Sequence, residues 1–230
     1  AFLTEQIEED LTAGDTDGAR HGLAVLRASA VQMSDMVRSL SNHIRFDRDD
    51  AFEAVQPDRL LRRVLRTLDF ELSQSGAKVE TSASIDLPAV LCQPPQIVQT
   101  LQNLIENALK YAGNSIPQIS VTIREDHCGM IDFEVADRGI GIPEEFIERI
   151  FEPFKRVPGT GDTQGTGLGL ATCKKVVQRH GGRIWCLSEP GKGTSIRFTL
   201  PIAEMANQNA HDENAHTSVL ASMKGLQLQG

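Results

Sequence analysis

The sequence contains a glycine-rich string, GTGLGL at residues 165–170, directly before ATCKKVVQRHGG, a segment with helical character. Glycine loses more backbone entropy than any other residue when it is held in order, so three glycines at alternate positions require a reason. A glycine-rich turn into a helix N-terminus exposes backbone N–H groups and the positive end of the helix dipole to an anion. The string therefore indicates a phosphate-binding turn, although a surface loop before a helix would have the same composition.

Further clusters could act together with this string. They read NLIENALKY at 103–111, DRGIGIP at 137–143, FEPFKR at 151–156 and GKGT at 191–194. Asn103, Asn107 and Lys110 follow one another at steps of four and three residues, so a helix would place them on one face. Glu106, next to Asn107, is expected to point elsewhere on that helix.

Composition and charge exclude several classes of protein. Of the 230 residues, 40% are hydrophobic and 23% are charged, which suits a globular protein of one or two domains. The net charge of −8 argues against nucleic acid or an anionic membrane as the main partner. The four cysteines form no CxxC pair, so neither a zinc site nor a disulfide framework is indicated, and a cytoplasmic location fits. No apolar run approaches the roughly 20 residues that span a bilayer, so no direct membrane contact is expected.

The first 50 residues show a helical pattern. Apolar residues from His21 to Phe46 recur at alternate steps of three and four, as in the seam of a helix bundle. A shorter helical stretch at 1–11 precedes them, joined by the turn-rich TAGDTDG at 12–18. Residues 1–50 are therefore expected to form a helical hairpin, half of a four-helix bundle, through which the chain makes a homodimer. Alternatively, the seam packs against the rest of the same chain.

Residues 51–202 mix helices and strands. Helices are expected over 57–76, 93–114 and 168–180, and a strand within 78–87. Segments 119–125 and 130–137 alternate apolar and polar residues around a turn, and 183–201 reads as a second hairpin. This order predicts an α+β domain of two layers, a sheet covered by helices on one face. Residues 203–230 lack strong periodicity and are expected to be a flexible tail or linker.

Taken together, in this order and spacing, the clusters resemble those of the sensor histidine kinases. These enzymes share the Bergerat ATP-binding fold with gyrase, Hsp90 and the mismatch-repair ATPases. The resemblance implies a two-layer α/β sandwich that binds ATP and Mg²⁺ and transfers the γ-phosphoryl group to a histidine. It also implies relay of that group to the receiver domain of a response regulator, in a two-component system. The chain, which starts within a helix and without an initiator methionine, is interpreted as a piece of a longer kinase.

The resemblance also implies roles for individual residues. Asn107 would bind Mg²⁺, with Asn103 and Lys110 as the other catalytic residues. Asp137 would accept a hydrogen bond from the adenine amino group and so exclude guanine, which offers a carbonyl there. Lys155 and Arg156 could reach the terminal phosphate, or be ordinary surface charge. The implied nucleotide-binding set is completed by Tyr111, Gly139, Gly141, Gly165, Thr166, Gly167, Leu168, Gly169 and Thr194.

Residues around the glycine-rich string would form a lid over the triphosphate. Phe151 and Phe154 are expected to be apolar anchors of this lid, with a packing role. His180, at the end of the following helix, is expected to cap or pack rather than to catalyse.

The hydrolases of this superfamily carry a glutamate four residues before the metal-binding asparagine, where this chain has Asn103, so transfer is favoured over hydrolysis. The family's acceptor histidine is followed by an acidic residue. His21 and His43 do not fit, and His211 precedes a carboxylate only within the expected tail. The acceptor is therefore expected upstream of Ala1. Two alternatives stay open: a degenerate kinase that acts as a dimerisation scaffold, and a protein serine kinase of the same fold, which would lack the hairpin.

Overall fold

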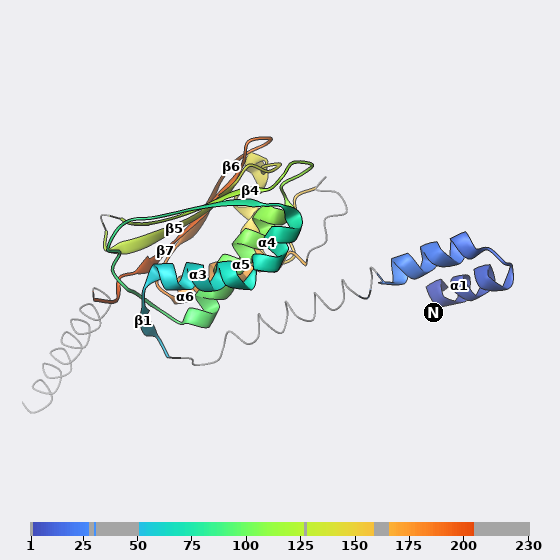
Figure 1. Ribbon diagram of the computed structural model, residues 1–230, viewed down its shortest axis with the longest axis horizontal. Helices are drawn as coiled ribbons and strands as arrows, with labels where there is room; N and C mark the ends of the chain where they lie inside the picture. Colours follow the sequence, from blue (N-terminus) through green and yellow to red (C-terminus); the bar gives the residue numbers. More distant parts are fainter. Residues whose placement is uncertain (1, 28–29, 31–50, 127, 159–165, 205–230) are drawn as a thin grey trace, which may run out of the picture.

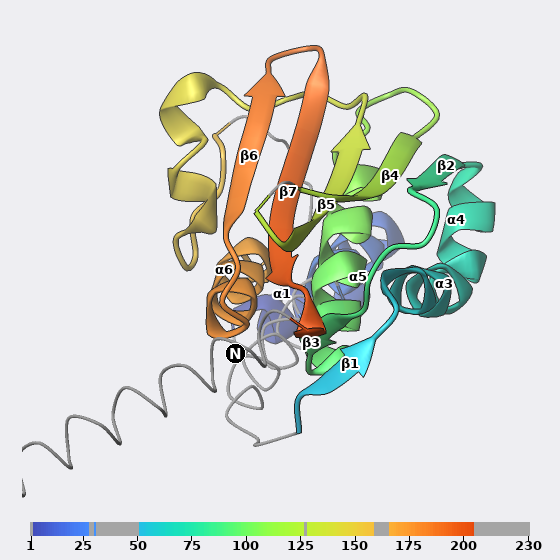
Figure 2. The same ribbon diagram turned by 90° about the vertical axis from the view of Figure 1, so that its left-hand side faces the viewer.

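The computed structural model describes residues 2–27, 30, 51–126, 128–158 and 166–204. Its centre is a five-stranded mixed sheet in the order β2-β4-β5-β7-β6 (Figures 1 and 2). The strands are β2 (Lys78–Ala83), β4 (Gln118–Glu125), β5 (Met130–Asp137), β6 (Ile184–Glu189) and β7 (Gly193–Pro201). β2 pairs with β4 in parallel, and every other pair is antiparallel. The two predicted hairpins are confirmed as β4–β5 and β6–β7.

Three helices cover one face of this sheet. They are α3 (Pro57–Thr67), α5 (Pro94–Lys110) and α6 (Gly169–Arg179), and all lie on the same side in both ribbon views (Figures 1 and 2). Proline occupies the first turn of α3 and of α5, where its missing N–H costs no hydrogen bond. The predicted α+β sandwich, with helices on one face of a sheet, is therefore confirmed.

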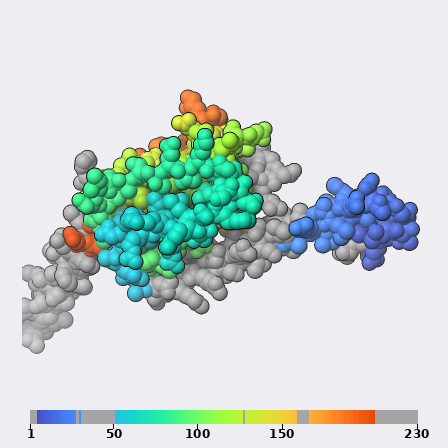
Figure 3. All heavy atoms as spheres, in the orientation of Figure 1, coloured from blue at the N-terminus to red at the C-terminus, as the bar shows by residue number. Residues whose placement is uncertain are grey.

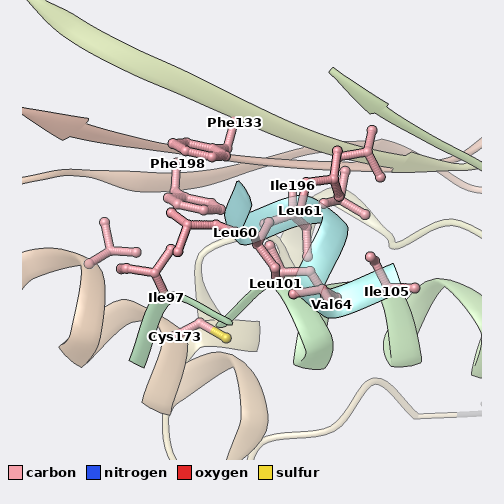
Figure 4. Packing of buried hydrophobic residues seen from close by; sticks show 14 of the residues in the cluster. Leu60, Leu61, Val64, Ile97, Leu101, Ile105, Phe133, Cys173, Ile196 and Phe198 are labelled. Atoms are coloured by element: carbon pink, nitrogen blue, oxygen red, sulfur yellow. The ribbon is translucent and has the colours of Figure 1, made fainter. Parts of the chain in front are cut away.

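The core lies between the sheet and these helices. Phe133 of β5 and Phe198 of β7 are register partners, and their rings stack with centroids 4.7 Å apart. Beneath them pack Leu60 and Leu61 of α3, and Ile97 and Leu101 of α5 (Figure 4). Alternation along the strands decides which side chains enter this layer: Ile119, Val121 and Ile123 of β4 are all buried. This packing fixes α5 and the end of β5 relative to each other.

The structure differs from the sequence-based expectation around residue 68. The single helix expected over 57–76 is two helices, α3 and α4 (Asp69–Ser75), separated by Leu68 with φ −92° and ψ 3°. Leu68 is buried, whereas no side chain of α4 is. No glycine or proline lies at this bend. We therefore attribute the bend to burial of Leu68 in the core rather than to a local helix breaker. In the space-filling view, α3 and α4 (cyan to teal) form one continuous part of the surface (Figure 3).

Two short strands were not expected from the sequence. β1 (Glu53–Val55) pairs antiparallel with β3 (Val90–Cys92) outside the main sheet, and Val90 also bridges to Ile202. The expected strand in the segment 78–87 is confirmed as β2, which occupies the first part of the segment and ends at Ala83. Two single-turn helices, η1 (Glu144–Phe146) and η2 (Arg149–Phe151), follow β5.

The N-terminal part contains α1 (Phe2–Thr12) and a helix over 16–27. The connection is shorter than expected because Asp15 caps the second helix, its Oδ1 accepting the Gly18 N–H at 2.9 Å. Ile7 of α1 is buried, and a Cβ placed on Gly22 would lie 2.5 Å from its side chain. Most of the predicted seam, 31–50, lies outside the described residues, as does 205–230 of the expected tail. No helix among the residues described is long and apolar enough to cross a bilayer.

Candidate active site

A cavity of about 500 Å³ lies beside the C-terminal half of α5. Two surfaces enclose much of it and are named here. The helix wall is formed by residues of α5 together with Tyr111, and the sheet wall by Val135, Asp137, Thr194, Ile196 and the loop 140–142. The lining is completed by residues of η2, of the segment between η2 and α6, and of the first turn of α6: Ile150, Lys155, Arg156, Val157, Thr166, Gly167, Gly169 and Leu170. Of the residues singled out in the sequence, those that line the cavity are Asn103, Asn107, Lys110, Tyr111, Asp137, Gly141, Lys155, Arg156, Thr166, Gly167, Gly169 and Thr194.

The helix wall carries a polar stripe. Asn103, Asn107 and Lys110 all line the cavity, as their spacing along α5 predicts. The amide nitrogen of Asn103 donates to the Sγ of Cys173 on α6, at 3.8 Å. The Lys110 ammonium lies 5.1 Å from the centroid of the Tyr111 ring. The wall therefore offers amide groups and one cation to whatever occupies the cavity.

The expectation for Glu106 was wrong. Glu106 also lines the cavity, although it is partly exposed to solvent. The helical spacing explains this, because residue 106 follows Asn103 by three positions and so shares its face. Partial burial and the nearby carboxylate of Glu71 raise the pKa of Glu106 above its usual range. A carboxylate thus borders the cavity beside the asparagines.

The sheet wall holds the carboxylate of Asp137 in one orientation. Its Oδ1 accepts two backbone hydrogen bonds, from Gly139 N–H at 2.7 Å and Thr194 N–H at 3.3 Å. Within the described residues, no hydrogen-bond partner is found for Oδ2. Partial burial raises the pKa of this carboxyl group, while the two N–H donors lower it and leave a net rise. The arrangement leaves one partly buried acceptor oxygen available to a ligand.

Glycines of the loop after Asp137 allow close contact between backbone segments. A Cβ on Gly139 would lie 2.2 Å from the carbonyl oxygen of Tyr111, and one on Gly141 would lie 2.1 Å from that of Glu189. Gly141 also has φ +69°, in the left-handed region. Gly139 does not line the cavity. The loop 139–141 therefore packs closely between the C-terminal end of α5 and the β6–β7 turn.

Sequence reasoning missed Ser188 of β6, which ties this loop to β7. Its Oγ accepts the Ile142 N–H at 2.8 Å, donates to the Gly193 carbonyl at 2.8 Å, and lies 2.9 Å from the Thr194 Oγ1. Ser188 and Thr194 are register partners in the β6–β7 pair. Only the predicted β6–β7 hairpin could have drawn attention to Ser188, since no local motif contains it.

The segment before the glycine-rich string reaches the cavity with two cations. Lys155 and Arg156 are exposed and line it; together with Lys110 they are called the cationic rim. Lys155 also lies 3.8 Å from the Glu152 carboxylate. Phe151 is buried as expected, but Phe154 is not an apolar anchor: it is 71% exposed with φ +62°.

The glycine-rich string meets the cavity at the start of α6. The Gly167 carbonyl accepts the Phe154 N–H at 2.9 Å, and Gly167 has φ +70°. The backbone atoms of Phe154 would lie 2.9 Å from a Cβ at Gly167, so glycine is required for this contact. Gly169 and Leu170 line the cavity, whereas Leu168 is buried and Gly165 lies outside the described residues.

His180 ends α6 as a packing residue. Its Nδ1 donates to the Val176 carbonyl at 2.7 Å, and its Nε2 accepts the Gln93 N–H at 3.0 Å. The side chain is buried, and its ring centroid lies 4.9 Å from that of Phe52. Burial lowers the pKa of the imidazole. His180 does not line the cavity, which fits the packing role expected from the sequence.

Comparison with known proteins places this arrangement in a family. Residues 92–204 match the family described as histidine kinase-, DNA gyrase B-, and HSP90-like ATPase. The catalytic domain of the histidine kinase ThkA is 30% identical with a TM-score of 0.58, over 66% of this chain and 97% of that domain. The chain belongs to the sensor histidine kinases. The crystal structure of full-length ShkA in complex with AMPPNP has a TM-score of 0.63 and a sequence identity of 25%. The similarity covers 84% of this chain and 39% of the ShkA chain.

Two curated relatives agree with this assignment. The adaptive-response sensory kinase SasA of Parasynechococcus marenigrum is 44% identical over 138 residues, which are 59% of this kinase chain and 36% of the relative. The phytochrome-like protein Cph1 of Synechocystis is 39% identical over 140 residues, 61% of this chain and 18% of the relative. The chain thus spans well under half the length of these relatives. It contains the ATP-binding catalytic domain of a histidine kinase.

Proposed function

We propose that this chain is the catalytic portion of a protein-histidine kinase, which transfers the γ-phosphoryl group of ATP to a histidine for relay to a response-regulator aspartate. The observation that carries the proposal is the cavity itself. It joins a partly buried acceptor on the sheet wall, Asp137 Oδ2, to a stripe of amides and cations on the helix wall and the cationic rim. A nucleoside triphosphate matches this arrangement, because it has a hydrogen-bonding base at one end and negatively charged phosphates at the other.

The base is proposed to lie against the sheet wall. Asp137 Oδ2 would accept a hydrogen bond from the 6-amino group of adenine, and Thr194 would contact the base through water. Tyr111 and the apolar side chains Ile140 and Ile142 would flank the ring, since they line the same cavity as Asp137. The carboxylate pairs well with a donor and poorly with the carbonyl of guanine, because two facing acceptors leave both unsatisfied.

The phosphates are proposed to lie between the cationic rim and the start of α6. Lys110, Lys155 and Arg156 supply positive charge, and Thr166, Gly167 and Gly169 line the cavity at the N-terminus of α6. The dipole of this helix adds to the attraction of the cations. Gly165 and Leu168 would complete this turn, in a role that follows from the resemblance.

Asn107 is proposed to hold Mg²⁺. The donor set fits a magnesium ion bound mainly by phosphate and water, since the helix wall brings an amide oxygen to the cavity and Mg²⁺ prefers oxygen ligands. No group of three or more His, Cys, Asp or Glu side chains suited to a metal is found among the described residues. When bound, the ion would neutralise charge on the phosphates.

Transfer rather than hydrolysis is supported by Asn103. An amide at this position cannot act as a general base, and its nitrogen is engaged by Cys173 Sγ. Glu106 borders the cavity from the same helix, so it is the carboxylate to test for residual hydrolysis. Phosphoryl transfer itself requires positioning and charge neutralisation more than protein-borne nucleophiles.

The acceptor histidine, the dimer and the partner are also part of the proposal. The domain division is residues 1–50 as a dimerisation hairpin, 51–202 as the catalytic domain and 203–230 as a tail. The acceptor would be carried on the first helix of the hairpin in the full-length protein, and a receiver domain would take the phosphoryl group. The helices at 2–12 and 16–27 support the hairpin, in which Ile7 packs near Gly22.

The test is incubation of the chain with γ-labelled ATP and Mg²⁺, beside Asn107→Ala and the matched control Gln118→Ala at an exposed position of β4. Both bound nucleotide and acid-labile protein phosphate are measured, the latter also after addition of a dimeric hairpin that carries the acceptor. We expect Mg²⁺-dependent ATP binding by the wild type and by Gln118→Ala, and its loss in Asn107→Ala. Label should enter the added hairpin only.

Several results would contradict the proposal. Failure of the wild-type chain to bind Mg-ATP would instead favour the degenerate scaffold. Acid-stable label on serine of an added protein would favour the serine kinase. Stable phosphohistidine on the chain itself would place the acceptor among its own six histidines, with His211 to be examined first.

A further inference from the structure

The Ser188 hydroxyl uses its one proton and both lone pairs in hydrogen bonds within the protein. Its Oγ meets three partners at 2.8 to 2.9 Å: the Ile142 N–H, the Gly193 carbonyl and the Thr194 hydroxyl. Ser188 does not line the cavity, whereas Ile142 and Thr194 do. The serine therefore lies directly behind the sheet wall.

The chemistry of these partners decides the direction of every hydrogen bond. A serine hydroxyl has one proton and two lone pairs. The amide of Ile142 can only donate, so it takes one lone pair, and the Gly193 carbonyl can only accept, so it takes the proton. The remaining lone pair of Ser188 faces Thr194 Oγ1. Thr194 must therefore donate its own hydroxyl proton to Ser188.

This direction determines what Thr194 offers to a ligand. With its proton held by Ser188, the Thr194 hydroxyl presents only lone pairs to the cavity. The backbone N–H of the same residue donates to Asp137 Oδ1, which orients the carboxylate so that Oδ2 remains available. Both polar side chains of the sheet wall are thus set as acceptors by one network centred on β6 and β7.

We infer that Ser188 is a positioning residue for nucleotide selectivity: by holding the Thr194 proton, it makes the sheet wall accept hydrogen bonds and so favours a 6-amino purine over a 6-oxo purine. This inference rests on the proposed function and deepens it. Without Ser188, the Thr194 hydroxyl is free to turn and donate to the water that would join it to the base, and that water would then be oriented to donate to a 6-oxo group. Selectivity is therefore the property that Ser188 controls, in addition to any effect on stability.

The test compares the dissociation constants of ATP and inosine triphosphate, which differ in the group at position 6 of the base, amino or oxo, and at the neighbouring N1, which carries a proton only in the 6-oxo base. We measure both for the wild-type chain and for Ser188→Ala, by titration calorimetry with Mg²⁺. The preference for ATP, given by the ratio of the two constants, should fall about tenfold in Ser188→Ala, the value of one neutral hydrogen bond. Ser188→Thr, which keeps the hydroxyl, should retain the wild-type ratio.

Matched controls separate positioning from a general loss of structure. Ser195→Ala removes a neighbouring hydroxyl that donates to Glu134 at 2.7 Å and does not line the cavity, so the ratio should not change. In a Thr194→Val background, Ser188→Ala should have no further effect on the ratio, since the hydroxyl that it orients is gone. Thermal unfolding of each variant shows that the folded state is present.

The failures of the two proposals are distinguishable. A wild-type chain that binds neither nucleotide overturns the proposed function, and the selectivity role of Ser188 with it. A wild-type chain that prefers ATP, with the same ratio in folded Ser188→Ala, overturns the role of Ser188 alone. That role is also overturned if Ser188→Ala lowers the ratio equally with and without the Thr194 hydroxyl.

Discussion

The sheet wall and the cationic rim of the cavity are built in different ways. On the sheet wall, backbone groups and short side chains hold one another: Asp137 accepts two N–H groups, and Gly141 brings its loop against the Glu189 carbonyl. The rim consists of long side chains, and both Lys155 and Arg156 are exposed. Backbone contacts fix positions closely, whereas exposed cations act through charge over longer distances. In the proposed function, the base would be recognised by the first kind of wall and the phosphates would be attracted by the second.

The largest effect should come from breaking the backbone contact of the sheet wall. Gly141→Ala places a Cβ 2.1 Å from the Glu189 carbonyl oxygen at φ +69°. We expect the free energy of unfolding to fall by about 3 kcal/mol, from steric overlap and left-handed strain together. Chemical denaturation measures it.

Gly191→Ala is the matched control for that substitution. Gly191 has φ +77° in the neighbouring turn, but a Cβ there would meet nothing within 4 Å. Its cost should be only the strain, about 1 kcal/mol. Equal losses in the two variants would show that close approach at Gly141 contributes nothing.

The next effect is on the acceptor of the sheet wall. Asp137→Asn keeps an oxygen for the two backbone donors but turns an amide donor toward the ligand. Affinity for ATP and for adenosine should fall by the same factor, about 30-fold, because the lost interaction is with the base. Calorimetric titration measures both. Asp69→Asn on the exposed α4 is the control, and a loss confined to ATP would count against base recognition by Asp137.

Removing charge from the cationic rim should give a smaller and different effect. The double substitution Lys155→Gln and Arg156→Gln should weaken ATP binding about tenfold at low salt and less at high salt, because exposed charges are screened. Adenosine affinity should not change. Lys174→Gln with Lys175→Gln, on the exposed side of α6, removes the same net charge away from the cavity. A similar loss of ATP affinity in that control would show that the cationic rim acts only through long-range electrostatics.

The smallest effect should be on the pH dependence of stability, through His180 at the C-terminal end of α6. The native state lowers the pKa of His180 below its ordinary value of 6.5, so the unfolded chain binds more protons below that pH. Stability should therefore fall as the pH drops below 6.5, and this part of the loss should be absent in His180→Gln. Thermal unfolding across that range tests it, with His21→Gln on the exposed N-terminal helix as control. Unchanged ATP affinity in folded His180→Gln would show that the cavity does not depend on this end of the helix.

Local patterns predicted much of the fold and of the candidate site. The two hairpins follow from apolar alternation, and the stripe on α5 follows from helical spacing, which also shows why the expectation for Glu106 was wrong. Phe154 was misjudged because an aromatic residue in an apolar-looking cluster is indistinguishable from its buried neighbour Phe151 until the backbone at φ +62° is known. The bend at Leu68 was missed for a similar reason, since its cause is burial in the core.

The sequence by itself determined the family, the order of the clusters and the residue types expected to meet the nucleotide. Only the tertiary structure decided which of them act together. Ser188 binds the N–H of Ile142, 46 positions away, and Asn103 donates to Cys173, 70 positions away. The reason is physical: such contacts depend on strand order and on how closely two backbones approach, which follow from packing of the whole domain and leave no periodic pattern in the sequence.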